Sequence, residues 1–167
     1  MKYRFIKSVS IIGFTLSLAA CSSVSLDDSA SGAGGAGASG GASGSGVMDP
    51  FNPSSVLAKD RSVYFDFDSY AVADQYRPLV EIHARYLASN PQQKILIEGN
   101  TDATGGAEYN LALGQRRAQA VSNMMTLIGA REVQIETISF GKEKPKARGD
   151  TEADYAANRR ADIVYLR

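Results

Sequence analysis

A run of 18 residues, 29–46, consists only of Ser, Gly and Ala and divides the chain into two parts. It holds 8 of the 16 glycines and no side chain large enough to contribute to a hydrophobic core. We therefore expect a disordered linker here, and a compact domain can form only from the residues that follow. The stiffer segment 49–53, Asp-Pro-Phe-Asn-Pro, ends the run, so we place the linker's end at residue 56 and the folded domain at 57–167.

The segment before this linker has the layout of a secretory signal. Three basic residues among the first seven precede an apolar stretch, 8–20, which is too short to span a bilayer as a stable helix. The stretch ends in Leu18-Ala19-Ala20-Cys21, which resembles the bacterial lipobox, in which the Cys thiol is acylated and the chain is cut just before the Cys. The alternative is an ordinary signal with an incidental Cys, but Cys21 is the only Cys of the chain. We predict a signal peptide at 1–20 and a lipidated Cys21, N-acylated and S-diacylglycerol-modified.

The predicted lipid would anchor the chain almost permanently, because each buried CH₂ contributes about 0.8 kcal/mol. Removing residues 1–20 from 167 leaves a mature chain of 147. Ser22 follows the Cys, and in Gram-negative lipoproteins an Asp there tends to retain the protein at the inner membrane, so Ser22 favours the outer membrane. Residues 21–56 would form the lipidated N-terminus and a flexible leash, with a coil dimension of about 33 Å and a limit of roughly 120 Å. The alternative is a spacer of no particular length.

The balance of charges excludes one class of partner. Residues 1–20 hold three of the 18 basic residues and no acid, so the remainder has 15 basic and 18 acidic residues and a net charge of −3. A nucleic-acid-binding protein normally carries a basic excess, so we expect no nucleic-acid partner. A single Cys also excludes an internal disulfide and a Cys-based zinc cluster.

The pattern of residues 57–167 predicts one α+β domain. Branched and aromatic residues predict strands at 62–67, 94–98, 134–139 and 161–166. Apolar residues spaced three and four apart predict helices at 74–89 and 108–128, with His83 packed on the apolar stripe of the first. We expect the polar segment 142–157 to be a loop. The order β-α-β-α-β-β predicts an α/β sandwich, a mixed sheet with helices packed on one face.

Asp66-Phe67-Asp68, at the end of the first predicted strand, is the first candidate site. It resembles the acidic pair of haloacid-dehalogenase-like phosphatases, which use Mg²⁺, and it could also begin a Ca²⁺ loop. The phosphatase site would need a third acidic cluster late in the chain, which we do not find. The Ca²⁺ loop would need Gly at its sixth position, where Ala71 stands. Two alternatives remain for this segment. One is a small Mg²⁺-dependent hydrolase that uses Asp66 and Asp68, and the other is a strand whose acidic side chains only face water.

Two further groups describe a clamp for a ligand with two charges. Asp102 follows the second predicted strand, in Gly99-Asn100-Thr101-Asp102, and Asn110, Leu113 and Arg117 share one face of the long helix. A carboxylate and a planar guanidinium together suit a ligand that carries an ammonium and a carboxylate, such as a free amino-acid end. Each charge-assisted hydrogen bond contributes about 1.5–3 kcal/mol, enough to recognise one repeating unit. Taken singly, Asp102 could close a turn and the helix face could be solvated.

Four segments carry a resemblance to a known family: 97–102, 108–118, 139–145 and 158–161. They closely resemble the OmpA C-terminal-like peptidoglycan-binding domain, and the resemblance covers about residues 60–167. It implies a non-enzymatic domain without catalytic residues, metal or cofactor other than the lipid. The ligand it implies is the meso-diaminopimelate of peptidoglycan stem peptides, whose second centre carries an ammonium and a carboxylate.

The resemblance also assigns site residues. The family's binding Asp and Arg lie 15 residues apart, as Asp102 and Arg117 do. The other positions that match ligand contacts are Phe67, Asp68 and Leu113. The same resemblance implies that three further residues hold the ligand-contacting residues in place without touching the ligand: Asn110, Asn158 and Arg159.

With the lipobox, the resemblance implies a lipoprotein of the outer membrane whose domain faces the periplasm and tethers the membrane to the cell wall. It implies peptidoglycan, the outer-membrane bilayer, and TolB with other Tol proteins as partners, in support of envelope integrity and cell division. The remaining alternative is a periplasmic adaptor in which the clamp is only structural.

Overall fold

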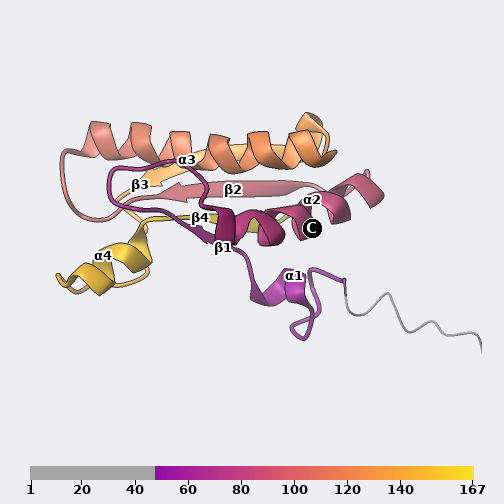
Figure 1. Cartoon of the computed structure of the whole chain (residues 1–167), viewed down its shortest axis with the longest axis horizontal. Coiled ribbons are helices and arrows are strands. Elements are labelled where there is room, and N and C mark those ends of the chain that lie inside the picture. The colour runs from indigo at the N-terminus through magenta and orange to yellow at the C-terminus, as the bar shows by residue number, and fades with distance from the viewer. Residues whose placement is uncertain (1–47) are drawn as a thin grey trace, which may run out of the picture. The chain divides into compact units, whose positions relative to one another are not determined.

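The computed structural model describes residues 48–167. The predictions that concern the signal peptide, Cys21 and the Ser/Gly/Ala run lie outside the described residues. Four strands and two long helices form the body of the domain (Figure 1). The strands are β1 (Ser62–Tyr64), β2 (Ile95–Asn100), β3 (Ile135–Gly141) and β4 (Arg160–Tyr165), and the long helices are α2 (Arg77–Ser89) and α3 (Ala107–Ile128). The shorter elements are α1 (Val56–Lys59), α4 (Glu152–Asn158) and the 3₁₀ turns η1 (Asp74–Tyr76) and η2 (Glu132–Gln134).

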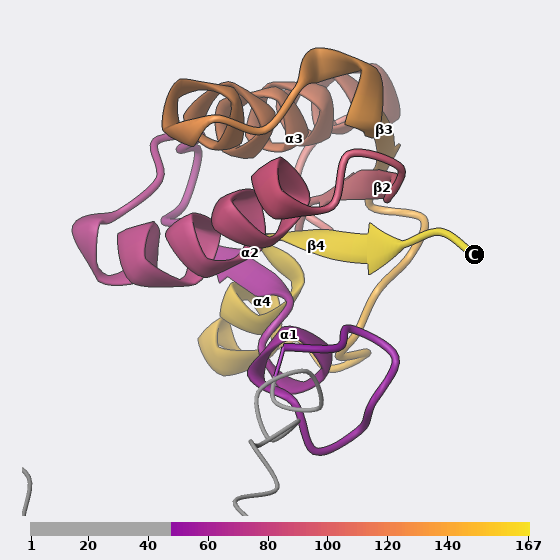
Figure 2. The same ribbon diagram turned by 90° about the vertical axis from the view of Figure 1, so that its right-hand side faces the viewer.

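The sheet is mixed and has the strand order β1-β4-β2-β3. β2 and β3 are parallel, whereas β4 runs antiparallel to both β1 and β2. α2 and α3 lie beside each other (Figure 2) and pack on the face of the sheet that carries the core residues of β2 and β4. The predicted α+β fold with a mixed sheet and helices on one face is therefore confirmed.

Two predicted elements differ from the structure. The first strand was expected at 62–67, but β1 ends at Tyr64, and the Phe65 N–H continues its pairing with one backbone hydrogen bond to the Arg159 carbonyl. The segment 142–157, expected to be a loop, contains α4. A capping box starts this helix, because the Thr151 hydroxyl accepts from the Asp154 N–H while the Asp154 carboxylate accepts from the Thr151 N–H.

His83 packs inside the domain, as its place on the apolar stripe of α2 predicts. Its Nε2 lies 2.7 Å from the Asp60 carbonyl and its Nδ1 lies 2.7 Å from the Tyr165 hydroxyl. Because a carbonyl can only accept, Nε2 carries the proton and Nδ1 accepts from Tyr165. The ring thus joins α2 to β4 and to the end of α1, whose Leu57 is fully buried.

Two glycines bring α3 against β2 without any side chain between them. A Cβ added at Gly99 would lie 1.8 Å from the Gly114 carbonyl oxygen, and one at Gly114 would lie 2.3 Å from the Ser139 hydroxyl. This close approach sets the height of α3 above the sheet, and with it the position of the side chains on the next turn of α3.

Candidate ligand-binding site

A pocket of about 280 Å³ lies between the loop after β1, the turn after β2 and the first three turns of α3. Its lining consists of Phe67, Asp68, Asp102, Thr104, Gly105, Tyr109, Asn110, Leu113 and Arg117. All five residues that the sequence assigns to ligand contact therefore line a single pocket, although they come from three separate segments.

Arg117 forms the inner wall and is almost completely buried, with 1% of its surface exposed. Its guanidinium donates to three backbone carbonyls: Ser69 at 2.8 Å, Asn100 at 2.9 Å and Asp66 at 3.2 Å. A guanidinium has five N–H groups, so these three bonds leave two without a hydrogen-bond partner among residues 48–167. Burial lowers the pKa of Arg117 to about 10, against the opposing effect of the Asp102 charge, and the group stays cationic at neutral pH.

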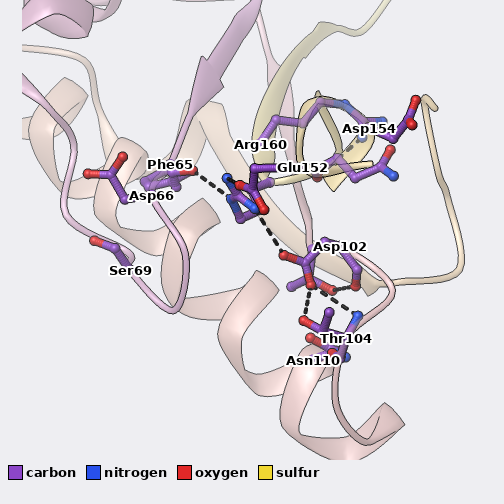
Figure 3. A network of polar contacts seen from close by, with 12 residues as sticks. Phe65, Asp66, Ser69, Asp102, Thr104, Asn110, Glu152, Asp154 and Arg160 are labelled. Carbon is purple, nitrogen blue, oxygen red and sulfur yellow. Dashed lines mark hydrogen bonds and ion pairs between the residues drawn. The ribbon is translucent and has the colours of Figure 1, made fainter. Parts of the chain in front are cut away.

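Asp102 brings a buried negative charge to the same pocket and is 4% exposed. Its Oδ1 accepts from the Thr104 N–H at 3.1 Å and from the Thr104 hydroxyl, and Figure 3 shows these contacts at the turn after β2. Its Oδ2 lies 3.4 Å from Arg159 Nη1. The carboxylate is thereby oriented by its own turn on one side and by a cation on the other.

Arg159 contacts Asp102 but does not line the pocket. Its Nε donates to the Phe65 carbonyl at 3.2 Å, and its Nη2 pairs with Glu152 of α4 at 2.6 Å. The supporting role that the resemblance implies for Arg159 stays a prediction. Because the ion pair with Glu152 and that with Asp102 share one guanidinium, α4 is connected electrostatically to the site.

The two asparagines assigned to supporting roles differ in position. Asn110 lines the pocket and donates to the Thr104 carbonyl at 2.6 Å, joining the start of α3 to the turn that holds Asp102. Asn158 does not line it. The Asn158 side chain instead binds the backbone of Lys146 and Ala147, with N–H···Oδ1 distances of 2.7 and 3.0 Å.

Asp68 and Phe67 form the outer rim. Phe67 is 67% exposed. Asp68 is exposed and, among residues 48–167, is the only non-glycine residue with positive φ, at 54°. Asp tolerates this left-handed conformation better than most residues do. Its Oδ1 accepts a hydrogen bond from the hydroxyl of Tyr109, in the first turn of α3.

Three residues that line the pocket were not predicted from the sequence: Thr104, Gly105 and Tyr109. Tyr109 could have been found from helical spacing, because it precedes Leu113 by four residues and Arg117 by eight. Thr104 lies two residues after Asp102, a spacing at which an Asp side chain commonly binds the following backbone.

In residues 48–167, the described part of the chain, no cluster of three or more His, Cys, Asp or Glu side chains is arranged to hold a metal ion. None of its helices combines the length and apolar character that crossing a membrane requires.

Comparisons with known proteins identify the family. The OmpA family model matches residues 64–160. Peptidoglycan-associated lipoproteins from Haemophilus influenzae and Pasteurella multocida are 41% and 38% identical to the chain, over 97% of it and 99% of each relative. The crystal structure of the peptidoglycan-associated lipoprotein from Burkholderia pseudomallei has a TM-score of 0.68 and 58% identity, and the match covers 70% of this chain and 98% of that one.

This family is structural and non-enzymatic, so the hydrolase alternative built on Asp66 and Asp68 is set aside. The length of the matches, which extends beyond the OmpA domain itself, includes the N-terminal region as well. The chain therefore belongs to the OmpA family, among the peptidoglycan-associated lipoproteins.

Proposed function

We propose that this chain is an outer-membrane lipoprotein that binds peptidoglycan non-covalently and tethers the membrane to the cell wall. The observation that carries the proposal is that Asp102 and Arg117, two almost fully buried groups of opposite charge, line one pocket. Burying charges is costly unless they are paired or bind something, and each of these two keeps hydrogen-bonding capacity toward the pocket. The names of the relatives support the same function.

The ligand we propose is the second centre of meso-diaminopimelate in a stem peptide. Its carboxylate would receive the two remaining N–H groups of Arg117, and its ammonium would lie on the acidic side, at Asp102 and Asp68. Leu113 and Phe67 would contact the methylene chain. At about 280 Å³ the pocket suits one amino-acid end rather than a whole disaccharide-peptide unit.

We infer further that the chain works in the Tol-Pal system, with TolB and other Tol proteins as partners, and supports envelope integrity and cell division. Family membership supports this inference. Cys21 would carry the N-acyl and S-diacylglycerol lipid that holds the chain in the outer membrane, with the domain on the periplasmic side.

Sedimentation with purified peptidoglycan sacculi tests the wall-binding proposal. The mature chain carries Cys21→Ser, so that it can be studied without a lipid. It is compared with the same chain that also carries Asp102→Asn. Asn keeps an acceptor for Thr104 but removes the charge, so we expect binding to weaken by about tenfold to a hundredfold. Asp150→Asn is the matched control, because it makes the same change at an exposed acid outside the pocket.

Two results would contradict the proposal. One is an Asp102→Asn chain that folds and sediments with sacculi as the unchanged chain does. The other is undiminished binding to sacculi that carry lysine in place of diaminopimelate, which would remove the assignment of the ligand. Arg117 is less suited to this test, because its loss would also leave three backbone carbonyls without their donor.

A further inference from the structure

Helix α3 holds the loop after β1 at two separate points. From inside, Arg117 donates to the carbonyls of Asp66 and Ser69, which fixes the backbone of the loop. From outside, the Tyr109 hydroxyl donates a hydrogen bond to the side chain of Asp68. Tyr109, Leu113 and Arg117 are spaced four residues apart, so they form one row along the pocket.

The two carboxylates of the pocket differ in how much of their hydrogen-bonding capacity is used. Asp102 already accepts from the N–H and hydroxyl of Thr104 and lies beside Arg159. Asp68 is exposed, and within residues 48–167 its carboxylate accepts only from Tyr109, through Oδ1. Its Oδ2 is therefore the carboxylate oxygen in the pocket with the most capacity left for an incoming cation.

Within residues 48–167, the Tyr109 hydroxyl is the only hydrogen-bond donor to this carboxylate. Asp68 lies on the outer rim in the left-handed region of φ, and an exposed side chain there is free to turn away from the pocket. The hydrogen bond to Asp68 raises the pKa of Tyr109, so the hydroxyl stays a donor at every physiological pH. The Tyr109 ring is 52% exposed and stands outside the core cluster, so its hydroxyl can be removed without opening the core.

We propose that Tyr109 is a positioning residue, which holds Asp68 over the pocket so that Oδ2 receives the ammonium of the ligand. The inference rests on the proposed function and extends it, because it assigns recognition of the ammonium to a pair of residues at the rim. Arg117 then recognises the carboxylate, and the two ends of the clamp can be altered independently.

Three synthetic stem tetrapeptides separate these two ends. The peptides differ in the charged groups at the end of the side chain of their third residue. In the first peptide this residue is meso-diaminopimelate, which carries an ammonium and a carboxylate there. In the second it is lysine, which carries the ammonium alone, and in the third it is 2-aminopimelate, which carries the carboxylate alone. Removing the hydroxyl with Tyr109→Phe should weaken binding of the first two by about tenfold, the loss of one charge-assisted contact, and leave the third unchanged. Tyr70→Phe is the control, since this neighbouring tyrosine is also half exposed but contacts Arg116 and not the pocket.

A double-mutant cycle supplies the second measurement. If Tyr109 acts through Asp68, Tyr109→Phe has no further effect in a chain that already carries Asp68→Asn. Equal weakening of all three peptides, additive effects in the cycle, or unchanged binding by Tyr109→Phe would each overturn the inference while leaving wall binding intact. An unaltered chain that binds neither the diaminopimelate peptide nor sacculi would overturn the proposed function, and this inference with it.

Discussion

Arg117 combines a structural role with its place in the pocket. Three of its N–H groups hold the loop after β1 and the end of β2 together, and its guanidinium lies 5.2 Å above the centre of the Phe65 ring. A lysine there would have a compact ammonium that cannot reach three carbonyls in a plane. The site is therefore built around an arginine that is oriented before any ligand arrives, which reduces the ordering that binding requires.

His83 gives the domain a predictable response to acid. Burial lowers its pKa below the usual 6.5, so in the unfolded chain His83 takes up its proton at a higher pH than in the folded chain. The free energy of unfolding should therefore fall as pH drops below about 6.5, by at most about 1.4 kcal/mol per pH unit. Urea denaturation between pH 7.5 and 5.5 measures this slope.

His83→Gln is the comparison for that measurement. His83 is the only histidine of the chain, so the variant, although less stable overall, should lose most of the pH dependence in this range. A variant with the same slope as the unaltered chain would show that another group titrates there.

At the scale of elements, the contact between α3 and β2 decides whether the site assembles. A Cβ at Gly99 would meet a backbone oxygen of α3, which cannot move aside alone. We expect Gly99→Ala to lower the free energy of unfolding by about 1–3 kcal/mol and to weaken ligand binding, because Asp102 follows β2 and Arg117 lies on α3. Denaturation and binding of the diaminopimelate peptide measure the two effects.

Gly106→Ala is the matched control for the glycine contact. Gly106 is the N-cap of α3, its φ is −76°, and a Cβ there meets no atom within 4 Å. Because Ala is a poorer N-cap than Gly, we expect a loss of stability of about 1 kcal/mol or less, while ligand binding should stay close to that of the unaltered chain. If Gly99→Ala also left ligand binding unchanged, the close approach would not be what positions α3.

The sequence predicts long elements well and pairings poorly. The helices and the central strands follow from apolar spacing and branched residues, as α2, α3 and β2 show. Helix α4 was not predicted because it is short and polar, although Thr151 and Asp154 are spaced as a capping box. The insertion of β4 between β1 and β2 depends on contacts distant in sequence, which no local pattern contains.

The candidate site was predictable only where one segment carried a pattern. The spacing of Leu113 and Arg117 on a helix is such a pattern, and so is a carboxylate at the end of a strand. The contact between Tyr109 and Asp68 is not, because it joins residues 41 positions apart. Its geometry follows from where α3 lies over the sheet.

At the scale of the whole molecule, we predict two attachments that can be removed separately: a lipid at residue 21 and a pocket beyond residue 64. When the lipid holds the chain in the membrane, the linker keeps the domain close to the wall. The effective concentration of the wall is then high, which strengthens the second attachment. In a Gram-negative host, a Cys21→Ser chain exported behind a signal peptide whose cleavage needs no Cys should leave the membrane fraction and still sediment with sacculi. Asp102→Asn should instead stay with the membrane and leave the sacculi after detergent treatment. The double variant should be found neither in the membrane fraction nor with the sacculi.

Two outcomes would contradict this prediction. A Cys21→Ser chain that remains in the membrane fraction would show that the anchor lies elsewhere. An Asp102→Asn chain that also leaves the membrane fraction would show that the two attachments are not independent.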